Sequence, residues 1–310
     1  MIERLFMGID GGGSKLRVAI VDANLEELSS LTAGAVNPSI VGRDAARERI
    51  QEGVLKSMRL ADIQREDIAA VGIGIAGASN LHSEAWLRET IKPALPSARI
   101  AVSSDLEIAL VGALGQREGL VVLAGTGSAV FGVSTAGRRL QVGGWGYLLG
   151  DQGSSFWIGT QLLKHVATTF DTGGDRGMTA LGRACLDTLG LTAPRDLVAW
   201  VYRSETAPAV RITSLAPFVL RRADAGDELA REILRGAARH LAKQLETMRR
   251  RLNDDEAPIA FAGGLLESDN WLSSELAKRL NLPARPAAKY APVVGAALLA
   301  MIEWSEMQEP

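Results

Sequence analysis

The sequence predicts an α/β protein whose two domains lie on either side of a cleft. At 310 residues the chain is longer than an average single domain. Strand-like and helix-like stretches alternate along it, and one pattern occurs twice. A glycine-rich turn between two strands, followed by helices and further strands, begins at residue 4 and again at residue 119. We therefore expect two related α/β halves.

In the first half, β-branched runs predict strands, and apolar residues at 3.6-residue spacing predict helices. Strands are expected at 4–10, 16–22, 25–33, 68–75 and 99–103, and helices at 44–59, 81–91 and 105–115.

In the second half the same signals predict three strands, a largely helical stretch, a fourth strand and a last helix with Pro292 in its first turn. The strands are expected at 119–125, 128–135, 138–142 and 258–262, and the clearest helices at 227–252 and 292–305. We place the domains at 1–116 and 117–291, and expect the last helix to pack back on the first domain.

Composition excludes several kinds of function. The formal net charge of −2 gives no reason to expect nucleic acid or an anionic membrane as a partner. No apolar stretch approaches the roughly 20 residues that span a bilayer. The one cysteine, Cys185, lies among apolar residues at helical spacing, so we expect it to be buried in a protein of the reducing cytoplasm. His82, His165 and His240 have no metal-binding spacing.

The turn at 8–15 resembles a phosphate-binding loop without matching one. Its glycines have the spacing of a Walker A loop, but Ser14 precedes Lys15 instead of following it, and a strand follows where a helix is required. Backbone N–H groups in such a glycine turn can still point at an anion. Asp10 stands at the strand end, where a carboxylate can hold hydrated Mg²⁺. The alternative is a tight hairpin that binds nothing.

A second glycine turn at 125–128 also connects two strands and carries the hydroxyls of Thr126 and Ser128. Such turns are common, so alone it says little. Together, the two turns suggest a phosphate chain held from both sides, and hence a phosphotransferase that uses a nucleotide.

Asp105 follows a predicted strand and opens a predicted helix. Asp105 or Ser104 could simply cap that helix, an effect worth about 1 kcal/mol. In a phosphotransferase cleft the same carboxylate could accept a proton from an attacking hydroxyl. Little further covalent chemistry is needed, because positioning and charge neutralisation dominate phosphoryl transfer.

The stretch 143–159 is the most unusual, with glycines interleaved with aromatic residues and an acid. We expect a loop packed closely against another part of the protein. It could be a polyol pocket in which Asp151 accepts protons from sugar hydroxyls. Alternatively, it could pack Trp145 and Tyr147 into a domain interface.

These motifs together resemble the N-acetylglucosamine kinase group of the actin–hexokinase superfamily, often grouped with the benzoyl-CoA-reductase-activator ATPases. The resemblance covers nearly the whole chain. It rests on 8–15, Ser104-Asp105, 125–128 and the Gly-Gly-Trp-Gly…Gly-Asp segment at 143–151. It implies the two-domain actin–hexokinase (ribonuclease H-like) fold and ATP-dependent phosphorylation of an amino sugar, first of all N-acetylglucosamine, at the 6-hydroxyl. It also implies a homodimer.

The resemblance also implies roles for single residues. Asp105 would be the catalytic base, and Asp10 would hold Mg²⁺ through water. The sugar would contact Asn37, Asp105, Gly144, Trp145 and Asp151. ATP would contact Gly11, Gly12, Gly13, Ser14, Lys15, Thr126, Gly127, Gly263 and Gly264.

Gln152 stands where this group often has glutamate, and an amide cannot accept two donors as a carboxylate does. Glucosamine and N-acetylmuramate therefore remain alternative substrates. An alternative of another class is the ATPase activator of a radical dehydratase or reductase. That chemistry requires cysteines from each subunit to hold a shared cluster, and Cys185 alone does not supply them.

Overall fold

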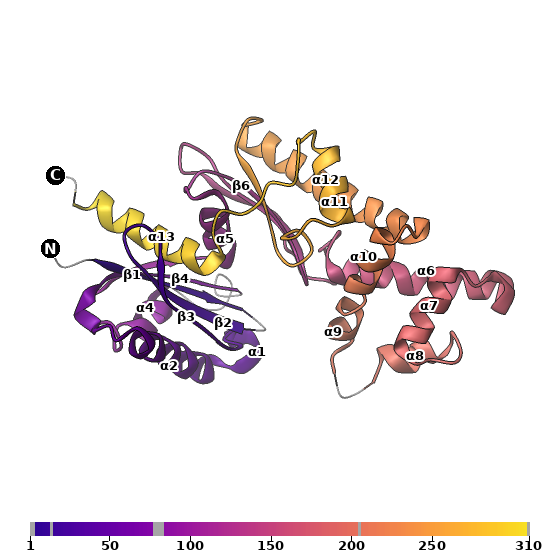
Figure 1. Cartoon of the computed structure of the whole chain (residues 1–310), viewed down its shortest axis with the longest axis horizontal. Helices are drawn as coiled ribbons and strands as arrows, with labels where there is room; N and C mark the ends of the chain where they lie inside the picture. The colour runs from indigo at the N-terminus through magenta and orange to yellow at the C-terminus, as the bar shows by residue number, and fades with distance from the viewer. Residues whose placement is uncertain (1–3, 13–14, 77–83, 204–205, 309–310) are drawn as a thin grey trace.

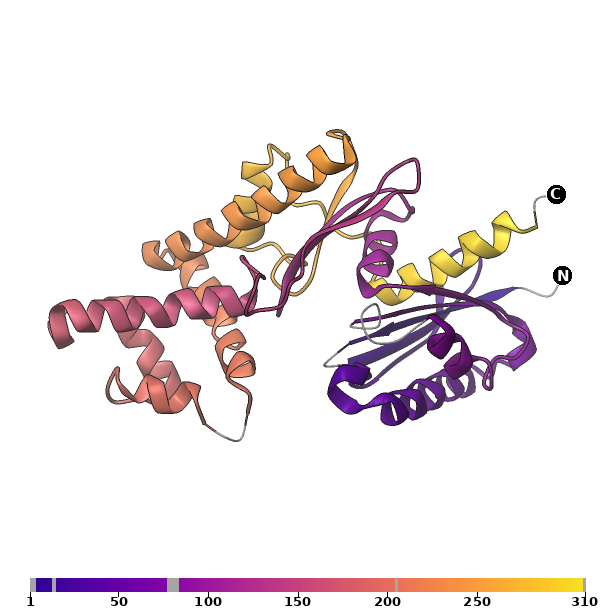
Figure 2. The same cartoon turned by 180° about the vertical axis from the view of Figure 1, so that it is seen from behind.

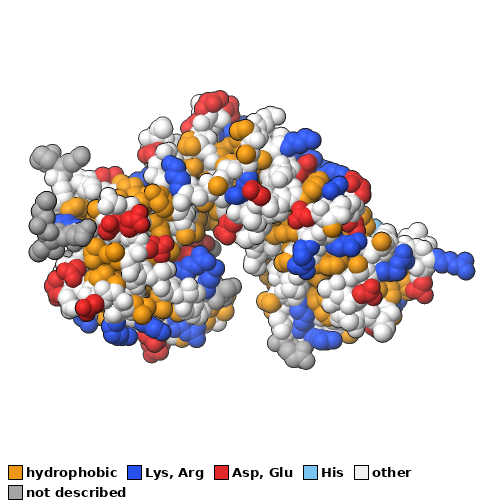
Figure 3. Space-filling model, in the orientation of Figure 1, with side chains coloured by type: hydrophobic (Ala, Val, Ile, Leu, Met, Phe, Trp, Pro, Cys, Tyr) orange, Lys and Arg blue, Asp and Glu red, His pale blue; other side chains and the backbone are white. Residues whose placement is uncertain are grey.

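The computed structural model describes residues 4–12, 15–76, 84–203 and 206–308. These residues form two lobes, each built on its own β-sheet (Figures 1 and 2). The space-filling view shows a deep hollow between the lobes, open at one edge of the molecule (Figure 3).

The first lobe holds a five-stranded sheet in the order β3-β2-β1-β4-β5. The first three strands form an antiparallel meander, and β4 and β5 continue the sheet in parallel beside β1. The strands are Leu5–Gly11 (β1), Lys15–Val21 (β2), Glu27–Gly34 (β3), Ile68–Ile75 (β4) and Arg99–Ser103 (β5).

Helices cover both faces of this sheet because its strands are apolar on both sides. Along β1, Leu5, Met7 and Ile9 pack against α2 and α4, whereas Phe6 packs against α13. Figure 1 shows α2 and α4 on one face and α13 on the other. The helices are Pro38–Val41 (α1), Arg43–Ala61 (α2), the 3₁₀ turn Arg65–Asp67 (η1), Glu84–Ile91 (α4), Asp105–Leu114 (α5) and Pro292–Glu306 (α13).

Helix α13 lies so close to the first sheet that only glycine fits where it crosses β1 and β4. Gly8 and Gly72 are register partners on those strands. A Cβ atom at Gly8 would lie 1.8 Å from a backbone oxygen of α13, and one at Gly72 would lie 1.9 Å from another. On its next face α13 meets α5, and a Cβ at Gly295 would lie 2.2 Å from an α5 carbonyl oxygen. Backbone therefore rests on backbone at both contacts.

The second lobe holds a four-stranded sheet in the order β8-β7-β6-β9. It repeats the first sheet's plan, because an antiparallel meander is extended by a parallel strand beside its first member. The strands are Gly119–Ala124 (β6), Ser128–Val133 (β7), Arg139–Gly143 (β8) and Ile259–Ala262 (β9). Helix α5 packs on this sheet as well as on α13, so both lobes share it.

The other helices of this lobe form a cluster around the apolar stripe of α11. Ile233, Leu241 and Leu245 lie on that stripe and are buried. No described helix is both long and apolar enough to span a membrane. The helices are Ser155–Gly177 (α6), Ala180–Leu189 (α7), Asp196–Val201 (α8), Pro208–Thr213 (α9), Ala216–Asp224 (α10), Glu228–Leu252 (α11) and Trp271–Arg279 (α12).

Each predicted strand is present, with ends displaced by no more than two residues. The predicted helices are also present, although the first three residues expected for 81–91 lie outside the described part. The stretch predicted only as largely helical contains helices α6 to α10. The hydrophobic periodicity of the sequence did not predict where one of these helices ends and the next begins.

Replacing Gly72 with Ala should lower the free energy of unfolding by about 1–3 kcal/mol, because the new methyl group would overlap the backbone of α13. Urea unfolding followed by circular dichroism measures the change. Gly34→Ala is the matched control: Gly34 also lies in a strand, and its Cβ would meet nothing nearer than the Arg49 side chain at 4.0 Å. Equal stability of the two variants would contradict the proposed close contact.

Candidate active site

The tip of the first hairpin lies where β1 ends and is tied to the start of α1. Gly12 O accepts hydrogen bonds from the backbone N–H groups of Val36 and Asn37, at 3.0 and 3.1 Å. At Gly11 a Cβ would lie 2.5 Å from the Val36 side chain, so only glycine fits. Asn37, predicted to contact the sugar, thus lies beside the turn predicted to contact ATP. Gly13 and Ser14 lie outside the described residues.

Asp10 lies in β1, and Asp105 begins α5 just after β5; Gly74 of β4 lies between these two strands. Gly74 of β4 pairs with Asp10 on one side and with Ser103 on the other. A Cβ at Gly74 would lie 2.8 Å from Ser104 O, so the start of α5 rests directly on the strand. Both carboxylates are partly buried at the carboxyl end of the sheet. Two carboxylates therefore lie at the same end of the first sheet.

Burial raises the pKa of Asp10 to about 6, and the charge of Asp105 acts in the same direction, against the opposing charges of Arg17 and Lys15. Arg17 is the register partner of Asp10 across the hairpin. Sequence reasoning missed Arg17, although a hairpin whose loop spans 12–15 places residue 17 opposite residue 10.

Asp105 occupies the first turn of α5 without capping it. The cap is Ser104, whose Oγ accepts the backbone N–H of Glu107 at 3.1 Å. Burial raises the pKa of Asp105, while the backbone N–H groups of Leu106 and Asp105 itself lower it. A carboxylate with a raised pKa is a better proton acceptor than an ordinary surface aspartate.

The second hairpin forms one unit with the start of α6 and the end of β9. Gly125 N–H donates to Gly127 O at 2.9 Å, and Ser155 N–H at the start of α6 donates to Gly125 O at 2.8 Å. Thr126 is exposed at the tip. Gly263 follows β9 with φ +86°, and a Cβ there would lie 2.5 Å from Ala124 O.

Gly264 is exposed beside the same turn, and its backbone nitrogen would lie 3.8 Å from a Cβ at Gly125. The four predicted ATP contacts of this lobe, Thr126, Gly127, Gly263 and Gly264, are therefore neighbours.

The Asp151 carboxylate accepts hydrogen bonds that stabilise the second hairpin and the loop beside it. Asp151 is 7% exposed and has φ +56°, unusual for a residue other than glycine. The backbone N–H groups of Ser128 and Gly146 donate to its carboxylate and lower its pKa, although burial raises the pKa overall. A Cβ at Gly127 would lie 2.7 Å from Asp151 Oδ2. Sugar binding by Asp151 stays a prediction, but its carboxylate already has structural partners.

The expectation that 143–159 packs closely along its length is wrong for its middle. Trp145 is 74% exposed, and Leu148 and Leu149 are 81% and 80% exposed. The reason is the backbone: Gly143, Gly144 and Gly146 all have positive φ and turn the chain away from the sheet. Burial resumes only from Asp151. Trp145 is thus not packed into a domain interface in this structure.

Cys185, His165 and His240 take structural positions. Cys185 is buried, and burial raises the pKa of its thiol to about 11. His165 contacts the Thr179 hydroxyl at 3.1 Å, and His240 packs edge-on against Trp157; His82 lies outside the described residues. Within the described part, no group of three or more His, Cys, Asp or Glu side chains is placed to hold a metal ion.

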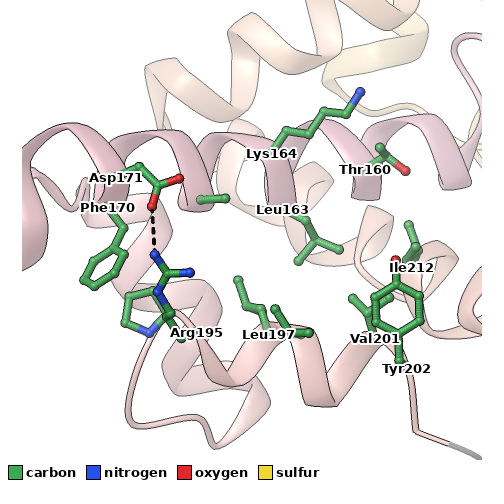
Figure 4. A pocket seen from close by; sticks show the side chains of 13 residues that line it. Thr160, Leu163, Lys164, Phe170, Asp171, Arg195, Leu197, Val201, Tyr202 and Ile212 are labelled. Carbon is green, nitrogen blue, oxygen red and sulfur yellow. Dashed lines mark hydrogen bonds and ion pairs between the residues drawn. The ribbon is translucent and has the colours of Figure 1, made fainter.

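A separate apolar pocket of about 320 Å³ lies between α6, α8 and α9 (Figure 4). Leu163, Leu197 and Ile212 form its walls, and the Asp171–Arg195 ion pair lies at its rim. No predicted site residue lines it.

The fold is that of a two-domain protein of the actin–hexokinase class. The chain belongs to the BadF/BadG/BcrA/BcrD ATPase family, which it matches over residues 7–300. The N-acetyl-D-glucosamine kinase of Dictyostelium discoideum is 31% identical to it, over 97% of this chain and 99% of the relative. The N-acetylmuramic acid/N-acetylglucosamine kinase of Clostridium acetobutylicum is 32% identical, over 89% and 90%.

A solved structure from Chromobacterium violaceum that carries an N-acetylglucosamine kinase designation is 27% identical, with a TM-score of 0.76. It covers 96% of this chain and is itself covered to 99%. The resemblance that the sequence motifs indicated is thereby confirmed.

Replacing Asp10 with Asn should raise the free energy of unfolding at pH 7 by about 1–2 kcal/mol. The folded-state pKa of about 6 exceeds the ordinary 3.8, so above pH 6 the native state bears the cost of a buried charge. That cost falls between pH 6 and 3.8, and below 3.8 the carboxyl is protonated in both states. Urea unfolding at pH 7 and at acidic pH should therefore show a gain that disappears in acid.

Asp22→Asn is the control, because the pKa of Asp22 is shifted in the direction opposite to that of Asp10. Asp22 lies in an exposed turn, where the backbone N–H groups of Glu26 and Asn24 lower its pKa, so its replacement should bring no gain at pH 7. A loss of stability in Asp10→Asn at both pH values would contradict the assignment.

Proposed function

We propose that this protein transfers the γ-phosphoryl group of ATP to the 6-hydroxyl of an amino sugar, with N-acetylglucosamine as its principal substrate. The observation that carries the proposal is the pair of partly buried carboxylates, Asp10 and Asp105, on either side of Gly74 and beside the first hairpin. The two relatives at 31% and 32% identity are amino-sugar kinases by name, and nearly the whole chain matches them.

Asp105 would act as the general base. Its raised pKa favours taking the proton of the attacking hydroxyl, and the first turn of α5 fixes the carboxylate through the Ser104 cap. Because the backbone at the start of α5 rests on Gly74, the helix turn that carries the carboxylate is fixed against β4. Positioning of this kind supplies much of the acceleration in phosphoryl transfer.

The two hairpins would hold the phosphates of ATP between the lobes, and the exposed Gly264 would lie against the adenosine. The donor set at Asp10 fits Mg²⁺, which binds through one or two carboxylates with water and phosphate oxygens completing its shell. When bound, Mg²⁺ would neutralise phosphate charge. A cation would also relieve the repulsion between Asp10 and Asp105.

Asn37 and the loop at 144–151 would contact the sugar. The Asn37 Oδ1 atom accepts the N–H of Ser39 at 2.9 Å, which fixes the orientation of the side-chain amide. Trp145 presents an exposed aromatic face from the opposite lobe. Glucosamine and N-acetylmuramate are the alternative substrates. We also propose that the protein forms a homodimer and functions in the reducing cytoplasm.

An activator of a radical enzyme is the candidate of another class. It would require cysteine ligands at a subunit contact, but the chain has one cysteine, and the thiol of Cys185 is buried in the second lobe. Colourless, iron-free protein would exclude this candidate.

A coupled ADP-release assay with glucose, glucosamine, N-acetylglucosamine, N-acetylmuramate and N-acetylmannosamine tests the proposal. The highest kcat/KM is expected with N-acetylglucosamine, and mass spectrometry should locate the phosphate on the 6-hydroxyl. ATP consumption that no sugar accelerates would refute kinase function.

Asp105→Asn should reduce kcat about 10²–10⁴-fold while leaving the Kd for ATP nearly unchanged, because the base is lost and the hairpins are not. Steady-state kinetics and calorimetry with ATP and Mg²⁺ measure the two quantities. Asp62→Asn is the matched control, since Asp62 is exposed at a helix end with φ +54°, a conformation that Asn adopts readily. Unchanged turnover in Asp105→Asn would remove Asp105 from its role.

A further inference from the structure

Glu107 is a buried carboxylate two residues after Asp105, and its partners come from both sheets. Its exposed fraction is 6%. From the end of β5 in the first sheet, Ser103 Oγ donates to Glu107 Oε2 at 2.9 Å. A carboxylate buried to this degree needs a countercharge as well as hydrogen bonds.

Arg139, the first residue of β8 in the second sheet, supplies that countercharge. Its Nε lies 3.0 and 3.1 Å from the two carboxylate oxygens of Glu107, and its Nη2 lies 2.9 Å from Oε1. The paired carboxylate raises the pKa of Arg139. Multiple charge-assisted bonds to a planar guanidinium fix distance and direction together.

The other contacts between α5 and the second sheet are apolar. Ile108 and Val111 of α5 pack in one cluster with Val121 and Phe131 of that sheet. Such contacts resist separation but do little to define angle, because apolar attraction is not directional. The Glu107–Arg139 pair supplies the direction that the apolar cluster lacks.

The pair also holds the turn that carries Asp105. Within residues 103–107, the Ser103 hydroxyl donates a hydrogen bond to the Glu107 carboxylate, and the Ser104 hydroxyl accepts one from the backbone N–H of Glu107. Residues two apart lie on different faces of a helix, so Glu107 fixes the turn from a different side than Asp105.

We propose that Glu107 is a positioning residue: through Ser103 and Arg139 it sets the orientation of the Asp105 turn relative to the second lobe. The inference rests on the proposed function, because Asp105 has to meet a phosphoryl group that the second lobe helps to hold. Glu107 itself touches neither substrate nor the reacting atoms.

The experiment compares Glu107→Gln, Arg139→Ala and Arg139→Lys, all assayed well below their melting temperatures. Glu107→Gln leaves no buried charge unpaired, because the Arg139 side chain is 47% exposed and can be hydrated. It therefore still tests the proposal if Arg139→Ala folds poorly. Glu107→Gln and Arg139→Ala should each lower kcat about 10–100-fold, while KM for ATP and for the sugar should change less than about two-fold. Arg139→Lys should recover part of the loss, since it restores the charge but not the planar fork.

Arg138→Ala is the matched control. Arg138 is the adjacent arginine, but its Nη1 donates to Arg251 O at 3.1 Å, within the second lobe. Its removal should leave kcat and both KM values unchanged.

A second readout does not depend on activity. Spin labels at Glu52→Cys in the first lobe and Asp187→Cys in the second, in a Cys185→Ser background, report the distance between the lobes by pulsed electron paramagnetic resonance. Both labelled positions are exposed. Glu107→Gln and Arg139→Ala should broaden the distance distribution relative to wild type, and Arg138→Ala should not.

An active wild type with unchanged kcat in Glu107→Gln and Arg139→Ala would overturn the inference. So would a loss of activity that follows only the unfolded fraction while the distances stay normal. A wild type that phosphorylates no sugar would instead overturn the proposed function. In that case an unchanged distance distribution would also show that the Glu107–Arg139 pair does not fix the relative orientation of the lobes. A broadened distribution would support that it does.

Discussion

The contact between α13 and the first sheet, in which backbone lies on backbone, is the constraint on which the arrangement of the lobes depends. Gly8 and Gly72 are paired across β1 and β4, and neither could carry a side chain beneath the helix. Because α13 also touches α5 through Gly295, and α5 packs on the second sheet, one helix sets the spacing of both lobes.

The site is assembled at a cost to stability. Asp10 and Asp105 both lose hydration, and the charge of Asp105 further destabilises the charged form of Asp10. Arg17 offsets part of this repulsion from across the hairpin. A fold selected for stability alone would not retain two such carboxylates, one in β1 and one just after β5, with only Gly74 of β4 between those strands. Their presence is the main physical support for the proposal that this edge of the sheet holds a cation and phosphates.

Local sequence signals predicted the elements and the places of the candidate site residues within them, because hairpin tips, strand ends and helix starts are local features. Asp105 could be placed at the start of a helix from its neighbours alone. The partners of Glu107 could not, since Arg139 lies 32 residues away and on another sheet. Nor could the hydrogen bonds of Asp151 be predicted: its donors, Ser128 and Gly146, meet it only after the loop has folded. Hydrophobic periodicity also did not predict that Trp145 and Leu148 would be exposed, because the backbone angles of the glycines determine the conformation of that loop.

The exposed stretch at 145–149 has a consequence for how such a chain diverges. Asp151 serves the second hairpin, so a change there would disturb the turn that it holds. Trp145, Leu148 and Leu149, by contrast, are mostly solvent-exposed. Mutations can therefore accumulate at these three positions with little penalty to folding, so the sequence of this part of the loop can diverge while the turn held by Asp151 stays unaltered.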